Sequence, residues 1–158
     1  MPVTQNTSHS EWPARLLAGS AAAAGEVAVI AAHPDDETVG LGARLPRLRE
    51  ATFVYVTDGA PRDGRDARAA GCATRQAYAR ARREEALRAL GLAGVAPDRV
   101  RFWDCADQEA SLHLADLARR TAALLRARRP DVVVTHPYEG GHPDHDATAF
   151  AVHTACRL

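Results

Sequence analysis

Residues 27–37 read VAVIAAHPDDE, an apolar run that leads without a break into a histidine and three acidic residues. Uninterrupted apolar runs of this kind are typical of strands that are covered on both faces of a parallel sheet. A second apolar run, residues 132–135 (VVVT), precedes the motif HPDH at residues 142–145. Packing does not explain imidazoles and carboxylates at the ends of two buried strands. The pattern instead indicates the two halves of one metal site.

Between these motifs the chain alternates strand-like and helix-like segments. Strands are predicted over residues 27–32, 52–57, 100–103 and 132–135. Helices are predicted over about 37–50, over about 74–90 before Gly91, between a capping Ser111 and Pro130, and from about Asp144, with a polar loop from Asp58 to about Cys72. This alternation predicts an α/β fold, a Rossmann-like three-layer α/β/α domain with a mostly parallel sheet. Right-handed crossovers then favour the strand order 3-2-1-4, in which strands 1 and 4 are neighbours.

Composition limits the classes of protein to consider. The chain has 158 residues, 46% of them hydrophobic, which suits a polar lead-in over residues 1–25 and a single domain over residues 26–158. Basic and acidic side chains number 20 each, so no nucleic-acid partner is indicated. No membrane span and no signal peptide are recognised, three cysteines outside any CxxC pattern favour a reducing compartment, and the cytoplasm is the expected location. The oligomeric state is not predicted.

The two histidine motifs are expected to converge, because ligands of such sheets bind at the carboxyl ends of neighbouring strands. His33 and Asp36 lie three residues apart on one turn, so both can reach one ion, and His145 completes the set. Two imidazoles and one carboxylate with an open position are the composition of a catalytic zinc site. The same ligands suit Fe²⁺, so ligand type does not settle the metal.

Four further residues are candidates for proton transfer or positioning. Asp35 lies between two predicted ligands and is free to take a proton from water at the metal. His142 could reach the other side of a substrate, and Asp144 or Asp146 could hold its imidazole in one tautomer and raise its pKa. Structural roles compete with these: Asp35 also suits a helix cap, and His142 suits a loop histidine bonded to backbone.

The remaining polar residues near the motifs carry weaker signals. Glu37 suits a first-turn acid or a partner that orients a metal ligand. His136 begins the loop before the second motif, so a supporting role is open to it. His113 and His153 lie on predicted helices and are expected at the surface or in packing.

The motifs AHPDDE and GHPDH resemble those of the PIG-L/LmbE-like family of zinc-dependent N-deacetylases, and the resemblance covers about residues 26–156. Less specific matches lie at residues 57–59, 82–91, 107–110 and 130–132. Members of this family typically remove acetyl from N-acetylglucosaminyl groups. The resemblance therefore implies a small-molecule N-acetyl amino sugar conjugate as substrate, hydrolysed by zinc-activated water to acetate and a free amino sugar.

The resemblance also implies roles by position. The implied zinc ligands are His33, Asp36 and His145. Asp35 would be the general base, and His142 would stabilise the tetrahedral oxyanion. The implied contacts with the sugar are Asp107, with Asp104 as a rival, and Arg82 or Arg83, between which the local register is ambiguous.

One departure from the family pattern concerns length. Relatives usually continue well past the helix that follows HPDH, whereas this chain ends at Leu158, so the domain is expected to lack the family's C-terminal part. That puts substrate binding in doubt more than metal binding, and it keeps two alternatives open: a metal-binding but catalytically poor truncated or regulatory relative, or a hydrolase of a different small amide. A nucleotide-binding module is disfavoured, because residues 40–42 (GLG) lack a third glycine and residues 35–37 would repel a phosphate. The aglycone of the substrate is not predicted.

Overall fold

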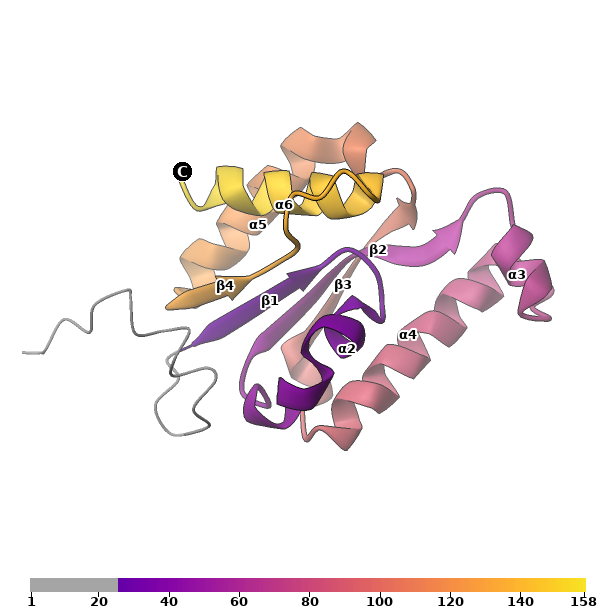
Figure 1. Ribbon diagram of the computed structural model, residues 1–158, viewed down its shortest axis with the longest axis horizontal. Helices are drawn as coiled ribbons and strands as arrows, with labels where there is room; N and C mark the ends of the chain where they lie inside the picture. Colours follow the sequence, from indigo (N-terminus) through magenta and orange to yellow (C-terminus); the bar gives the residue numbers. More distant parts are fainter. Residues whose placement is uncertain (1–25) are drawn as a thin grey trace, which may run out of the picture.

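The computed structural model describes residues 26–158, and the lead-in predicted over residues 1–25 lies outside the described residues. The sheet has four parallel strands in the order β3-β2-β1-β4 (Figure 1). The strands are β1 (Val27–Ala31), β2 (Thr52–Pro61), β3 (Val100–Asp107) and β4 (Val132–Val134). The predicted strand order is confirmed, and β1 and β4 are neighbours as right-handed crossovers require.

Helices cover both faces of this sheet (Figure 1). The α-helices are α2 (Asp36–Leu41), α3 (Arg65–Ala69), α4 (Arg75–Leu92), α5 (Leu114–Arg128) and α6 (Pro143–Ala155), and the 3-10 helices are η2 (Gly42–Arg47), η3 (Pro97–Arg99) and η4 (Ala110–His113). One face packs against η2 and α4, and the other against α5 and α6. The predicted three-layer α/β architecture is therefore confirmed. Among residues 26–158, no helix combines the length and apolar content that a membrane crossing demands.

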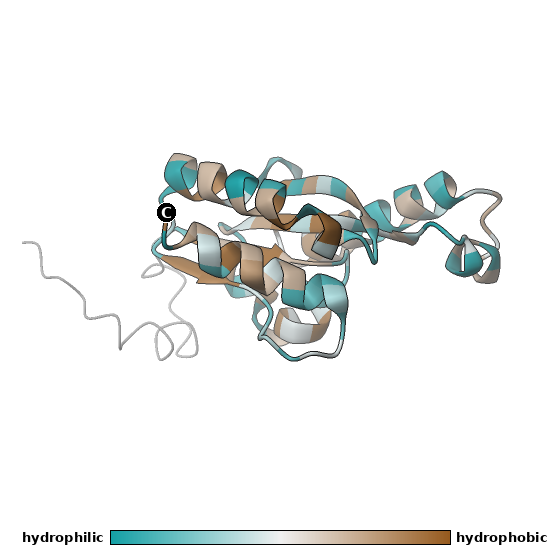
Figure 2. Ribbon diagram, turned by 90° about the horizontal axis from the view of Figure 1, so that it is seen from above, coloured by the Kyte–Doolittle hydropathy of each residue, from teal (hydrophilic) through white to brown (hydrophobic). Residues whose placement is uncertain are grey.

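Successive side chains of β1 point into two separate cores. On one face Val29 packs with Phe53 of β2 and Leu90 of α4. On the other face Ile30 packs in a core that also contains Leu117 of α5. Because β1 is buried on both faces, its sequence is apolar throughout, and Figure 2 shows the hydrophobic colour concentrated in the strands.

The helix predicted over residues 37–50 is wrong in its second half. The α-helix α2 ends at Leu41, and residues 42–47 form the tighter 3-10 helix η2. Gly40 and Gly42 are poor α-helix formers, and Pro46 has no N–H to continue the α-helical ladder. The short α2 therefore serves mainly to hold the turn that follows β1.

Two further boundaries differ from the prediction. The loop predicted from residue 58 is instead the end of β2 and the helix α3, because β3 is longer than expected and pairs with β2 as far as Pro61 and Asp107. The cap predicted at Ser111 is wrong, since that residue lies in η4 and α5 begins after His113. The N–H of Ala110 donates to a buried carboxylate at 3.0 Å, which holds this segment in a 3-10 turn before the α-helix begins.

Two leucines of α4 test the position of the core. Leu90 is fully buried, whereas Leu92, two residues later, is 93% exposed. We expect Leu90→Ala to lower the free energy of unfolding by about 2–5 kcal/mol, because it removes core contacts and leaves a cavity. Leu92→Ala is the matched control and is expected to change it by less than about 0.5 kcal/mol. Urea denaturation followed by circular dichroism measures both, and equal effects would contradict the packing described here.

Candidate metal centre

The turn after β1 and the first turn of α6 meet at the carboxyl edge of the sheet. His33 follows β1, and His142 and His145 lie at the start of α6. The ring centroid of His33 lies 4.6 Å from that of His142 and 5.2 Å from that of His145. One nitrogen from each of these three rings lies within 4.8 Å of the others. The predicted meeting of the two motifs is thus confirmed.

Three carboxylates surround the imidazole of His33. Its Nε2 lies 3.2 Å from Asp107 and 3.2 Å from Asp144, and its Nδ1 lies 3.4 Å from Asp36. The backbone N–H of His33 also donates to Asp36 at 2.6 Å, which fixes the turn. Burial by itself lowers the pKa of His33, but interactions with these three carboxylates raise it to about 11. The surroundings of His33 therefore favour a positive charge.

A second group of donors adjoins the first and consists of Asp36, His136 and His145. The Asp36 carboxylate lies 3.3 Å from Nε2 of His145 and 3.3 Å from Nε2 of His136. The two imidazoles stack with centroids 4.0 Å apart. Burial raises the pKa of Asp36, but hydrogen bonds with His136 and His33 lower it far below its usual range, so the carboxylate is ionised. His136, for which the sequence left a supporting role open, lies inside the cluster.

This donor set fits a divalent metal ion. Imidazole and carboxylate at such mutual distances are the ligands of zinc and Fe²⁺. Asp107 Oδ1 is buried and lacks a hydrogen-bond partner within residues 26–158, although Nε2 of His33 lies 3.2 Å away. A buried carboxylate oxygen in that state is stabilised by a cation beside it, either the protonated ring of His33 or a metal ion that takes the place of that proton. The predicted ligands His33, Asp36 and His145 all belong to the cluster, but no single group of mutually close donors contains all three, so their selection stays a prediction.

The two candidates for a sugar contact on β3 differ in position. The carboxylate of Asp107 is 13% exposed and faces His33. Asp104 is 62% exposed and pairs with Arg83 at 2.5 Å, away from the cluster. Asp107 is therefore the residue at the centre, and its contact with a sugar stays a prediction.

Asp144 is fully buried and joins three segments of the chain. Its carboxylate accepts hydrogen bonds from the backbone N–H groups of Gln108 at 2.6 Å and Ala110 at 3.0 Å, and it lies 3.2 Å from Nε2 of His33. Desolvation raises the pKa of Asp144, but hydrogen bonds with His33 and with the two backbone groups lower it overall. The residue is therefore placed to position His33, with no surface from which to touch a substrate.

His142 is oriented by the backbone of α6. It is the N-cap residue, and its Nδ1 accepts from the N–H of Asp144 at 3.2 Å, which leaves the ring proton on Nε2. The prediction that a neighbouring carboxylate holds this ring is wrong, because Asp144 faces His33 and Asp146 accepts from the backbone of Gly140 at 3.1 Å. Burial and the charge of His33 lower the pKa of His142, so the predicted rise is also wrong. His142 is a neutral hydrogen-bond donor here.

Asp35 points away from the cluster, as predicted. Its carboxylate is 54% exposed and pairs with Arg82 at 3.0 Å. Arg82 is thus the arginine beside Asp35, whereas Arg83 pairs with Asp104, and the contact of either arginine with a substrate stays a prediction. Asp35 is the N-cap position of α2 but makes no side-chain capping bond. Gly59 packs closely against this turn. Its φ is +62°, and a Cβ there would lie 2.9 Å from Cδ of Pro34, so a side chain at this position would clash with the turn.

Glu139 is a residue of the site that the sequence did not indicate. Its Oε1 lies 2.7 Å from Nδ1 of His145, so the carboxylate orients the ring and turns Nε2 toward Asp36. The backbone N–H groups of Glu139 and Gly140 donate to Asp146, which holds the loop in place. Nothing in the local pattern EGGHPDH marks this glutamate as a histidine partner.

Glu37 lies in the first turn of α2 and is buried, as a first-turn acid. It accepts from Thr38 Oγ1 at 2.7 Å and has no contact with a predicted metal ligand among the interactions described here. Burial raises its pKa. His113 and His153 are exposed and lie outside the donor groups, in agreement with the sequence.

Fold and site together define an α/β protein with a histidine–carboxylate cluster at the carboxyl edge of its sheet. The family model described as "PIG-L: GlcNAc-PI de-N-acetylase" matches residues 28–156. The chain belongs to the PIG-L family. No curated protein matches the chain.

Several solved structures share this fold. An N,N'-diacetylchitobiose deacetylase from Pyrococcus horikoshii is 24% identical with a TM-score of 0.68, over 98% of this chain and 61% of that one. A deacetylase of teicoplanin biosynthesis, solved with teicoplanin, is 21% identical with a TM-score of 0.71, and the match covers 84% of this chain and 65% of that one. GalB, the 4-carboxy-2-hydroxymuconate hydratase of Pseudomonas putida, is 23% identical with a TM-score of 0.66, and the match covers 83% of this chain and 55% of that one. The chain thus spans less than two thirds of each, and a hydratase shares the fold with deacetylases, so fold alone does not fix the reaction.

The contact between Glu139 and His145 predicts an effect on metal affinity. We expect Glu139→Ala to weaken Zn²⁺ binding by roughly 10–100-fold, because the ring of His145 loses the partner that orients it. Competition with a chromogenic chelator measures the affinity. Glu84→Ala removes an exposed glutamate of α4 and is expected to bind Zn²⁺ like the unchanged protein. Equal affinities for all three proteins would show that Glu139 does not position His145.

The raised pKa of His33 predicts proton release on metal binding. At pH 7.5 the metal-free protein carries a proton on His33, because its pKa is about 11. Coordination requires the neutral ring, so Zn²⁺ binding should release at least one proton, and the apparent affinity should fall as the pH is lowered. Titration calorimetry in two buffers of different ionisation enthalpy measures the release. Binding heats that do not depend on the buffer would contradict the charge assigned to His33.

Proposed function

We propose that the protein is a metal-dependent hydrolase that removes acetyl from a small N-acetylglucosamine conjugate. Membership of the PIG-L family supports this reaction, and so do the two deacetylases among the similar structures. The observation that carries the proposal is the convergence of His33, His142 and His145, whose nitrogens lie within 4.8 Å of one another beside an exposed Asp35. Both the substrate and the reaction are proposals, because the chain spans 61% and 65% of those two deacetylases.

Zn²⁺ is the proposed cofactor, and Fe²⁺ suits the same donors. His33, Asp36 and His145 would hold it, with Asp144 and Glu139 keeping the two histidines in position. When bound, such an ion supplies Lewis acidity, which makes water acidic enough to ionise near neutral pH and polarises an acyl oxygen.

Asp35 is the proposed general base. Its carboxylate is 54% exposed, whereas the carboxylate of the adjacent Asp36 is only 17% exposed, so Asp35 is the more open of the two to water and substrate. Arg82 holds it at 3.0 Å and is itself a proposed substrate contact, together with Asp107. A positioned base of this kind contributes about 10²–10⁴-fold to the rate.

His142 is the proposed stabiliser of the oxyanion. The Asp144 N–H occupies its Nδ1, so Nε2 carries a proton that can be donated to the acyl oxygen. Removing such a donor typically costs about 10²–10³-fold in rate. The water oxygen bonds to the acyl carbon as Asp35 accepts a proton of water, and the acyl oxygen becomes the oxyanion. The carbonyl then forms again as the C–N bond breaks, and the amine takes up the proton that Asp35 accepted. The products are acetate and a free amino sugar.

Asp35→Asn tests the proposal. We expect kcat for amine release from an N-acetylglucosamine glycoside to fall by about 10²–10⁴-fold, because the amide cannot accept the proton of water. The zinc content should not change, since Asp35 belongs to none of the donor groups. Fluorescamine detection of the amine and elemental analysis of the metal give the two readings.

The matched control is Asp98→Asn, an exposed aspartate of η3 at the opposite edge of the sheet, which should leave both readings unchanged. Full activity in Asp35→Asn would remove Asp35 as the base. A fully zinc-loaded protein that releases no amine from any N-acetyl sugar would reject the proposed reaction and leave a metal-binding relative without this activity.

A further inference from the structure

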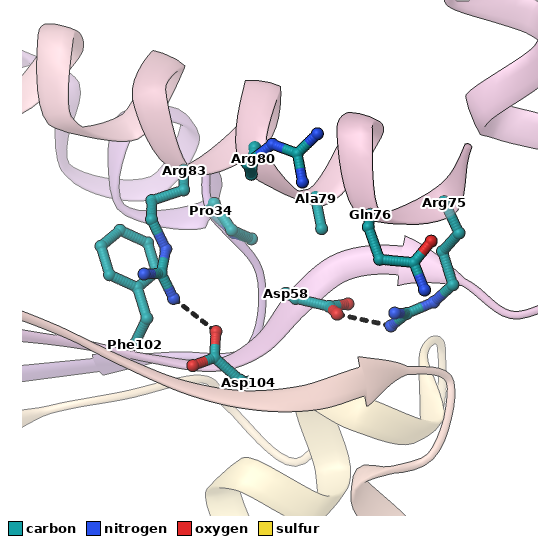
Figure 3. Close-up of a pocket in the computed structure, with 9 residues that line it drawn as sticks. All are labelled: Pro34, Asp58, Arg75, Gln76, Ala79, Arg80, Arg83, Phe102 and Asp104. Atoms are coloured by element: carbon teal, nitrogen blue, oxygen red, sulfur yellow. Dashed lines mark hydrogen bonds and ion pairs between the residues drawn. The ribbon is translucent and has the colours of Figure 1, made fainter. Parts of the chain in front are cut away.

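A cavity of about 400 Å³ opens beside the proposed catalytic turn, between α4 and the strands β2 and β3 (Figure 3). Pro34, which follows His33, forms part of its wall. The cavity is separate from the histidine cluster and contains none of the proposed metal ligands. Pro34 is thus the residue through which the cavity wall adjoins the turn that carries His33 and Asp35.

The amino-terminal half of α4 lines this cavity and contributes nothing to the core. The buried residues of α4 are Ala86 and Leu90, both in its carboxyl-terminal half. Earlier in the helix, Gln76, Ala79 and Arg83 fall on one side at helical spacing and line the cavity. Ala79 is the small residue in the middle of this row, and its short side chain leaves space between longer neighbours (Figure 3).

Two arginine–aspartate pairs close the two ends of the cavity (Figure 3). Arg75 pairs with Asp58 of β2 and also donates to the carbonyl of Ala60 at 2.9 Å. Arg83 pairs with Asp104 of β3 at 2.5 Å. Both guanidinium groups are thus neutralised by their own partners and held in place.

Asp104 is directed toward Arg83 by an irregularity of the sheet. Its φ is +59°, in the left-handed region that a residue with a side chain rarely adopts. It lies where the register of β2 and β3 shifts, between the pairs Tyr55–Phe102 and Thr57–Cys105. Bulges of this kind redirect a side chain and are frequent beside functional sites. The guanidinium of Arg83 also stacks over the Phe102 ring, 4.3 Å from its centroid.

Arg80 is the third arginine of the cavity, and it is exposed. Within the part of the chain that the structure describes, it forms no ion pair or hydrogen bond, and Figure 3 draws it between Arg83 and Gln76 without a dashed contact. Three arginines and two aspartates line the cavity, so one positive charge is left without a counterion. A guanidinium in this state suits a carboxylate or phosphate group.

We propose that this cavity is a subsite for an anionic group, a carboxylate or a phosphate, on the part of the substrate that remains after deacetylation. Arg80 supplies the charge, Gln76 supplies an amide donor, and the two paired arginines form the walls. The inference rests on the proposed deacetylation, because it names the site that binds the other end of the same substrate. It places a specificity-determining residue on α4, outside the histidine motifs.

Kinetics on three substrates with zinc-loaded protein test this subsite. The neutral substrate is the methyl glycoside of N-acetylglucosamine. The two anionic substrates are N-acetylglucosamine 1-phosphate and the carboxymethyl glycoside of N-acetylglucosamine. We expect an anionic substrate to have the higher kcat/KM, and we expect Arg80→Gln to lower that value by about tenfold, as for the loss of one charge-assisted hydrogen bond. The neutral glycoside should be unaffected. A preference for the phosphate or for the carboxylate identifies which anion the subsite takes.

Arg88→Gln is the matched control, an exposed arginine of the same helix outside the cavity, whose partner Glu84 lies 3.9 Å away. It should leave all three values unchanged. If Arg80→Gln lowers kcat/KM equally for the neutral and the anionic substrates, or changes it for none of them, the anion subsite is overturned while the proposed deacetylation stands. If the unchanged protein releases no amine from any of the three, the proposed reaction itself fails.

Discussion

The contact between the buried Asp144 carboxylate and His33 is the constraint on which the site depends. One carboxylate accepts the backbone N–H groups of Gln108 and Ala110 and lies 3.2 Å from Nε2 of His33. It thereby joins the end of β1, the turn after β3 and the first turn of α6. The contact of Asp36 with Nε2 of His145, at 3.3 Å, is a second link between the two histidine motifs, and the two contacts together hold the motifs in one register at the edge of the sheet.

The residues of the turn after β1 differ in how far they are exposed to solvent. Asp36 and His33 lie inside and are enclosed by opposite charge, so they suit coordination of a cation. Asp35, one residue before Asp36, turns outward and remains open to solvent. Two adjacent aspartates can therefore have different roles because the tight turn after β1 points them in opposite directions. The hydrogen bond that the N–H of Asp144 donates to Nδ1 of His142 also has two effects, since it caps the first turn of α6 and fixes the tautomer of His142.

The sequence predicted the parts of this molecule that depend on pattern and chain topology. The apolar runs identified the four strands, and the handedness of crossovers fixed their order and brought residue 33 near residue 145. Side-chain directions after the turns could not be read in this way. Asp144 faces His33 rather than His142 because of how α6 begins, and Glu139 reaches His145 only through the loop in which Gly140 has a φ of +69°. Such contacts depend on backbone angles that no periodicity encodes.

The amino-terminal half of α4 has a consequence for how proteins of this architecture diverge. Since Ala86 and Leu90 are the buried residues of the helix, the turns before them can exchange an exposed side chain such as that of Arg80 without the loss of a core contact. Selection for a new small molecule can therefore act on those turns while the fold keeps its stability. The residues that carry out the reaction and the residues that select the substrate would then evolve at different rates within one chain.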